Sequence, residues 1–130
     1  GDANAAAIAE LDANQIRITR FYSAGGQNRS LHRSILSDAD LRDAYLAAAY
    51  LREANLEGAN LQNANLTGAD LDYANLTGAN LVGANLTGAT CYNCDFAGAD
   101  LTGANVGGVD FRGARDLILQ GTIGTPAQMP

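Results

Sequence analysis

A large apolar residue recurs at every fifth position of the chain from residue 31 to residue 111. Thirteen of these 17 positions hold Leu, and the others hold Cys91, Phe96, Val106 and Phe111. A small apolar residue stands two positions before the large one, at 16 positions from 39 to 114. Fourteen of these hold Ala, and the others hold Cys94 and Val109. The remaining three positions of each five are mostly polar, so every repeat offers one large and one small residue to a core.

A period of five fits neither regular secondary structure. On an α-helix it advances by about 140° beyond a full turn, so the large residues spread around the axis. On a β-strand, an odd period sends successive large residues to opposite faces. The pattern therefore predicts a chain that turns a corner every five residues and directs its Leu and Ala side chains to one interior.

The position two residues after the large one indicates the shape of the corner. It holds Gly at residues 58, 68, 78, 83, 88, 98, 103, 108 and 113, and Asn at residues 63 and 93. A type II turn needs positive φ at its third residue, which Gly and then Asn adopt most easily. The same position holds Asp38, Asp43, Ala48, Glu53 and Tyr73, which resist positive φ. We expect type II corners from residue 58 onward except at Tyr73, and type I-like or irregular corners at those five residues.

The repeated phrase resembles that of the pentapeptide repeat family, whose pattern is A(D/N)LXX. Examples are Ala39-Asp40-Leu41-Arg42-Asp43, Ala54-Asn55-Leu56-Glu57-Gly58 and Ala79-Asn80-Leu81-Val82-Gly83, and the match covers about residues 34–115. The resemblance implies an all-β fold, a right-handed quadrilateral parallel β-helix with four repeats, or 20 residues, per coil. It implies about four coils over residues 31–115, stacked at the spacing of β-strands, about 4.8 Å.

The two ends of the chain depart from the repeat. Residues 1–30 are expected to form an N-terminal cap, with an α-helix over about residues 2–14 followed by an irregular segment. Asp2 can cap that helix, and Ile8 and Leu11 lie on one of its faces. Residues 116–130 are expected to be a C-terminal cap and tail, with an apolar plug at residues 117–119.

The charge of the chain argues against nucleic-acid binding. The formal net charge is −6, from 8 basic and 14 acidic residues, whereas nucleic-acid-binding surfaces are basic. No run of 18 apolar residues is present, so we expect no membrane insertion by this segment. The beginning of the chain shows no signal peptide. The compartment stays open between the cytoplasm and, where a leader or membrane segment is removed, the periplasm or thylakoid lumen.

Two cysteines and one histidine are the candidates for chemistry. Cys91 and Cys94 form a Cys-x-x-Cys motif, but they occupy a Leu and an Ala position of the repeat. They fit buried free thiols, a structural disulfide or a redox site, and the helix that supports a redox motif is not expected here. His32 has no carboxylate or Cys at ligand spacing and reads as a solvated residue. We expect no catalytic residue, no metal site and no cofactor.

The acidic residues support two interpretations. Seven acids and no base lie from residue 53 to residue 110, which suits solubility or the imitation of DNA. Relatives in the family inhibit DNA gyrase by imitating DNA, but a 20 Å duplex carries roughly 12 charges, so seven acids over four faces fall short.

Folding the sequence at 20 residues per coil gathers Tyr and acidic residues on one face. The candidate protein-binding patch there comprises Glu53, Asp70, Asp72, Tyr73 and Tyr92.

These observations favour a non-catalytic structural or protein-interaction module, or the soluble domain of a larger protein, acting on an unknown protein partner. We expect a monomer rather than a dimer. The alternative is a DNA-mimicking inhibitor of a type II topoisomerase, and a weaker alternative is a thiol redox protein.

Overall fold

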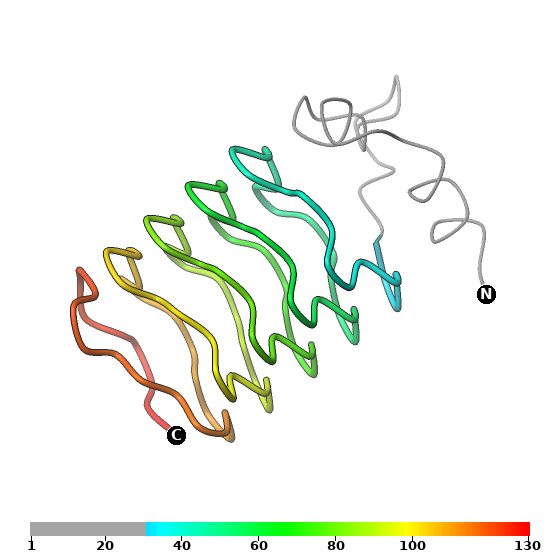
Figure 1. Ribbon diagram of the computed structural model, residues 1–130. Coiled ribbons are helices and arrows are strands. Elements are labelled where there is room, and N and C mark those ends of the chain that lie inside the picture. The colour runs from blue at the N-terminus through cyan, green and yellow to red at the C-terminus, as the bar shows by residue number, and fades with distance from the viewer. Residues whose placement is uncertain (1–30) are drawn as a thin grey trace.

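A computed structural model describes residues 31–130 of the chain. Over this range the chain winds into a stack of similar coils, which Figure 1 shows from cyan at one end to red at the other. The expected N-terminal cap, with its helix at residues 2–14, lies outside the described residues.

The coils are held together by single-residue parallel β-bridges. Thirteen of the fifteen bridges join residues twenty positions apart, from Ile35↔Asn55 to Asp95↔Arg115. Backbone hydrogen bonds run both ways between neighbouring coils: Leu66 N donates to Asn85 O over 2.7 Å, and Asn85 N donates to Ala64 O over 2.9 Å. Within residues 31–130 the chain contains no helix and no strand longer than one bridged residue. The predicted period of four repeats per coil is confirmed.

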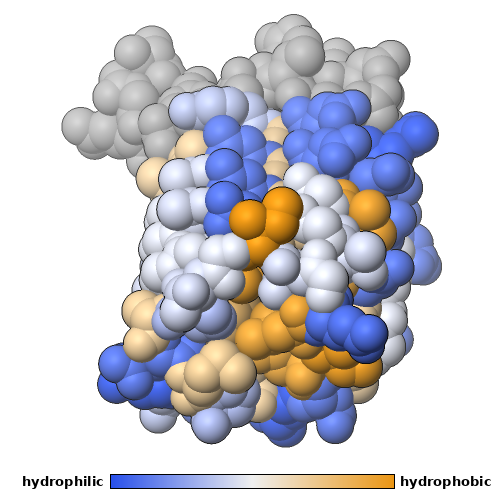
Figure 2. Space-filling view, turned by 90° about the vertical axis from the view of Figure 1, so that its left-hand side faces the viewer, coloured by the Kyte–Doolittle hydropathy of each residue, from blue (hydrophilic) through white to orange (hydrophobic). Residues whose placement is uncertain are grey.

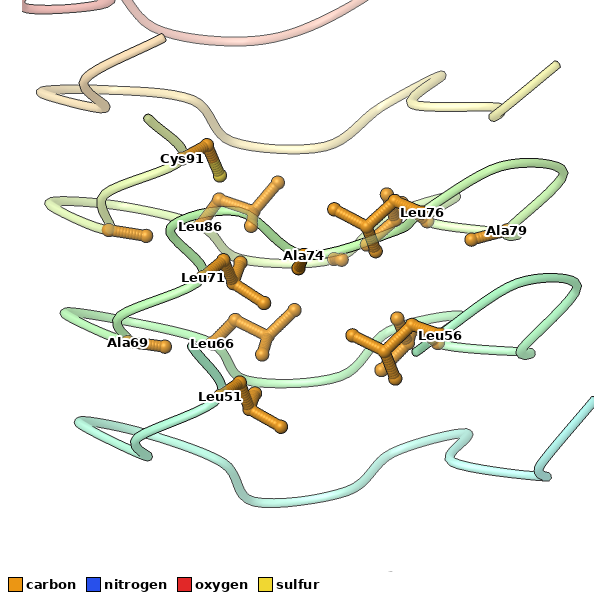
Figure 3. Packing of buried hydrophobic residues seen from close by; sticks show 14 of the residues in the cluster. Leu51, Leu56, Leu66, Ala69, Leu71, Ala74, Leu76, Ala79, Leu86 and Cys91 are labelled. Atoms are coloured by element: carbon orange, nitrogen blue, oxygen red, sulfur yellow. The ribbon is translucent and has the colours of Figure 1, made fainter. Parts of the chain in front are cut away.

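The large and small residues of the repeat fill the interior of the stack. Leu66 and Leu86 lie one above the other in one column, and Leu51, Leu71 and Cys91 form another (Figure 3). All five of these side chains are buried completely, at 0% exposure. Each core residue therefore packs mainly on its counterparts in the coils before and after it, as in other solenoids.

The prediction for the Gly-poor corners is wrong. The backbone has positive φ at Asp38 (59°), Asp43 (61°), Ala48 (59°), Glu53 (62°) and Tyr73 (63°), close to the 68° of Gly58. These residues therefore adopt the same turn as the glycines, closed by a bond from the N–H of the small residue to the carbonyl of the large one.

The neighbouring coil explains this result. Every one of these corner residues donates its own backbone N–H to the coil that follows, as Ala48 N does to Thr67 O over 2.8 Å. Positive φ costs an L-residue roughly 1–2 kcal/mol, and leaving a buried or paired backbone group without its partner costs about as much or more. The stacking of the coils therefore determines the backbone conformation at the corner, and the conformational preference of the residue does not.

Ala48 offers a direct test of that balance. Replacing Ala48 by Gly is expected to raise the free energy of unfolding by roughly 0.5–1 kcal/mol, because the strain at φ 59° disappears while the unfolded chain gains some freedom. Urea denaturation followed by circular dichroism measures it. Ala47→Gly is the matched control, since Ala47 lies in the same turn and is not among the residues with positive φ. It is expected to lower stability by about 0.5–1 kcal/mol. Equal destabilisation by both changes would contradict the strain argument.

Residues 116–130 continue the stack as a partial coil. Ile123 pairs with Asn105 and Gln128 pairs with Asp110, at a spacing of 18 residues instead of 20. Leu117 and Leu119 pack against the core. The part of this segment expected to be a tail is thus hydrogen-bonded to the last full coil.

The C-terminal end also exposes apolar side chains. Ile118, Ile123 and Met129 are 64%, 59% and 55% exposed. Apolar surface gathers in one area of Figure 2, which views the molecule from this side. Across the described coils, no helix has the length and apolar character that crossing a membrane requires.

Candidate functional site

One side of the stack carries most of the exposed tyrosines. We call it the tyrosine face. It comprises Tyr50, Arg52, Glu53, Asp70, Asp72, Tyr73, Thr90, Tyr92, Asn93, Asp110 and Arg112. The bridges Tyr50↔Asp70, Asp70↔Thr90 and Thr90↔Asp110 run along it and hold its residues in register. All five residues of the predicted patch lie on this face.

Aromatic rings and guanidinium groups form a ladder along the tyrosine face. Arg52 Cζ lies 5.4 Å from the centre of the Tyr73 ring, and Arg112 Cζ lies 5.9 Å from that of Tyr92. The Tyr73 and Tyr92 rings meet edge to face, with centroids 5.7 Å apart and an interplanar angle of 76°. Both rings stay partly open to solvent, at 45% and 38% exposure. The ladder is therefore an exposed surface whose side chains hold one another in place.

The arginines of this face, and Arg33 in the coil before it, are paired with carboxylates. Arg33 Nε donates to Glu53 Oε2 over 2.6 Å, and Arg112 Nη2 donates to Asp110 Oδ2 over 2.7 Å. Arg52 Nη1 lies farther from Asp70 Oδ2, at 4.0 Å. The hydrogen bond from Arg33 lowers the pKa of Glu53, and those from Arg112 lower the pKa of Asp110. Both carboxylates therefore stay charged at lower pH than an ordinary carboxylate does.

Asp72 has a different environment. At twelve positions of the repeat, Asn or Asp Oδ1 accepts a hydrogen bond from the N–H two residues later, as Asp70 Oδ1 does from Asp72 N over 3.0 Å. Thr90 stands where this acceptor is usual. Asp72 Oδ1, from the preceding coil, instead accepts the hydrogen bond from Tyr92 N, over 2.9 Å. This bond ties the Asp72 carboxylate to the backbone of Tyr92 in the next coil.

His32 is less isolated than the sequence indicated. Its Nδ1 lies 3.0 Å from Arg52 O, and its ring stacks on that of Tyr50 at 5.4 Å. Its Nε2 lies 4.0 Å from Glu53 Oε2. The His32 side chain is 38% exposed, but the coil brings the Glu53 carboxylate beside it from 21 positions away, which the local sequence does not indicate. His32 and Arg33 extend the tyrosine face by one coil, and the 20-residue period could have found them.

The structure holds Cys91 and Cys94 as buried free thiols. Cys94 Sγ donates a hydrogen bond to Leu71 O over 2.9 Å. Contact with Cys94 and complete burial raise the pKa of Cys91 well above its usual value. A thiol in this environment is a poor nucleophile. Over residues 31–130, no three His, Cys, Asp or Glu side chains gather as a metal site would require.

The repeat itself decides the family. The family model for pentapeptide repeats matches residues 30–63, 49–88 and 79–115, with eight copies. The chain belongs to the pentapeptide repeat family. No curated protein matches the chain significantly.

The chain is similar to several solved structures of pentapeptide repeat proteins. Rfr23 from the cyanobacterium Cyanothece 51142 is 28% identical, with a TM-score of 0.53 over 77% of this chain and 63% of Rfr23. The protein alr5209 from Nostoc PCC 7120 is 30% identical, with a TM-score of 0.41 over 85% of this chain and 99% of its own. A trypsin-treated form of QnrB1, a plasmid-mediated fluoroquinolone resistance protein, is 22% identical, with a TM-score of 0.38 over 80% of this chain and 57% of QnrB1.

Membership of the family and the similarity to Rfr23 imply that the stack is a right-handed β-helix, as the resemblance predicted. Two of the three come from cyanobacteria. The chain spans about two thirds of the length of Rfr23, at 63%.

Proposed function

We propose that this pentapeptide repeat chain is a non-catalytic protein-interaction module that binds a partner protein through the tyrosine face. The observation that carries the proposal is the exposed ladder of Arg52, Tyr73, Tyr92 and Arg112. Tyrosine and arginine are, with tryptophan, enriched among the residues that dominate the binding energy of protein interfaces.

The rigidity of the stack adds to this argument. Binding usually costs free energy because side chains lose rotamer freedom at the interface. The rings and guanidinium groups of the tyrosine face already hold one another, and the coils beneath are bonded residue by residue. Binding of a partner would therefore remove little further rotamer freedom from the side chains of this face. The face with Asn65, Thr67, Asn85 and Thr87 presents small polar groups over these two coils, with Tyr45 one coil before them, and makes a natural control.

The experiment compares two double variants. The chain is used to isolate its partner from extracts, and the purified pair is then studied by calorimetry. Tyr73→Ala/Tyr92→Ala is expected to weaken binding by about 30-fold or more, the size of a hot-spot loss. Thr67→Ala/Thr87→Ala, on the control face, is expected to leave the affinity within about threefold. An unchanged affinity in the tyrosine variant would refute the proposal, provided that its circular dichroism spectrum matches that of the wild type.

The topoisomerase hypothesis needs a dense row of negative charge instead. Four of the seven acids from residue 53 to residue 110 have an arginine nitrogen within 4.0 Å: Glu53, Asp70, Asp95 and Asp110. Few charges are left to imitate the roughly 12 of a 20 Å duplex. A DNA-gyrase supercoiling assay is the matching test, and we expect no inhibition. Inhibition at low micromolar concentration would favour the DNA mimic over the interaction module.

A further inference from the structure

We infer that the carboxylate of Asp72, together with the rings of Tyr73 and Tyr92, is the docking point for a basic side chain of the partner protein. The inference rests on the proposed function and names the chemistry that the partner must offer, which is a lysine or arginine that protrudes from its surface.

The charges of the tyrosine face point to a basic ligand. Three of its carboxylates have an arginine nearby, in the pairs Arg33–Glu53, Arg52–Asp70 and Arg112–Asp110. Each pair is neutral. No arginine within residues 31–130 comes within ion-pair distance of Asp72, although the Asp72 charge helps to raise the pKa of both Arg52 and Arg112. With four carboxylates and three arginines, the face together with Arg33 keeps one negative charge in excess. Residues 31–130 as a whole hold eleven acids and five arginines, so the wider field has the same sign.

The geometry around Asp72 suits a cation. Its Oδ1 is held by Tyr92 N at 2.9 Å, so the carboxylate has a fixed direction and keeps further lone pairs for a ligand. Tyr73 follows Asp72 in the chain, and the Tyr92 ring lies 5.7 Å from that of Tyr73. Aromatic rings attract a cation through their quadrupole, and a carboxylate attracts it by its charge. The carboxylate and the two rings belong to neighbouring coils of the same face, where each ring already lies beside one of the chain's own guanidinium groups.

Other ligand chemistries fit less well. An anionic side chain would face the excess negative charge of the tyrosine face and of the described chain as a whole. An apolar side chain would remove water from that carboxylate and replace none of its hydrogen bonds, which is costly. A basic side chain supplies both the hydrogen bonds and the opposite charge.

The test follows the backbone amides by nuclear magnetic resonance while a tripeptide is added to the folded chain. The probes are capped Gly-Arg-Gly and Gly-Lys-Gly, with Gly-Glu-Gly and Gly-norleucine-Gly as controls. The amide of Tyr92 is the reporter, because it donates directly to Asp72. We expect saturable shifts with the two basic peptides, with dissociation constants on the order of millimolar, and none with the controls.

Two variants make the result specific. Asp72→Asn keeps an oxygen for the hydrogen bond from Tyr92 N and removes the charge. It is expected to lower the affinity for the two basic peptides by about fivefold. Asp100→Asn removes one charge two repeats away around the coil, and it is expected to change the affinity by less than about 1.5-fold. Equal effects of the two variants, or equal shifts with the glutamate or norleucine peptide, would overturn the inference.

Asp72→Asn is also measured against the natural partner. Partner binding that falls in this variant supports the basic docking point. Binding that is lost in Tyr73→Ala/Tyr92→Ala but unchanged in Asp72→Asn overturns the docking point while the tyrosine face remains the binding site. Binding that neither variant changes overturns both.

Discussion

Replacing Leu66 by Ala is expected to lower the free energy of unfolding by about 3 kcal/mol, since large-to-small changes at buried leucines cost roughly 2–5 kcal/mol. Leu66 is 0% exposed and lies in a column between Leu46 and Leu86. Its backbone bond to Asn85 O does not involve the side chain, so the variant keeps its hydrogen bonds and loses packing alone. The neighbouring coils are held at their spacing by those bonds and cannot close the cavity.

Leu119→Ala is the control for this prediction. Leu119 belongs to the partial coil at the C-terminal end and packs against the core only partly buried. We expect a loss of about 1 kcal/mol or less there. Urea denaturation followed by circular dichroism gives both values. A cost for Leu66→Ala no larger than that for Leu119→Ala would show that the coils relax into the cavity, contrary to the argument.

The second large effect concerns the reactivity of Cys91 and Cys94. Both thiols are 0% exposed, and the pKa of Cys91 is raised, so the reactive thiolate is scarce and shielded. A thiol reagent can reach them only when the coils open. If this opening costs more than about 4 kcal/mol, reaction in the folded chain is roughly 1,000-fold slower than in the unfolded chain. Ellman's reagent at pH 8, with and without 6 M guanidinium chloride, measures the ratio.

The same measurement addresses the thiol redox hypothesis. A redox enzyme needs an accessible thiolate of lowered pKa, so rapid reaction in the folded chain would support that hypothesis. Cys94→Ala provides an independent check, because Ala occupies fourteen of the 16 positions equivalent to Cys94 and should be accommodated. We expect no insulin-reductase activity in the wild type and no change in this variant. Activity that Cys94→Ala abolished would contradict the interpretation of the pair as core residues.

The fold was predictable because the repeat encodes it many times over. One position of each five is large and apolar and another is small, so a departure from Leu or Ala at Cys91 or Val109 does not obscure the pattern. The corners were not predictable from the same rule. Ala48 and Tyr73 adopt a backbone that their own preferences oppose, since their N–H groups bond to Thr67 and Tyr92 of the next coil.

The candidate site also has a part that the sequence predicts and a part that it does not. The five residues of the predicted patch share a face because the 20-residue period places them there, and arithmetic on the sequence finds such columns. The contacts within the face depend on the positions of individual side-chain atoms, which the period does not specify. Tyr92 N reaches Asp72 Oδ1 because Thr90 lacks the acceptor that Asn or Asp provides elsewhere. The stacking of His32 on Tyr50 depends on ring orientations that no periodicity specifies.

The 20-residue coil makes the tyrosine face modular in a particular sense. Losing a whole coil shortens the stack and leaves every later residue on its own side. Losing a single repeat between Tyr73 and Tyr92 would rotate all later residues by one side of the quadrilateral, while Leu still follows Leu inside. The packing of the core would change little, whereas Tyr73 and Tyr92 would lie on different sides of the stack and lose their contact. In this architecture, inserting or deleting a repeat can therefore abolish recognition without harming the fold, so the surface can evolve far more freely than the interior.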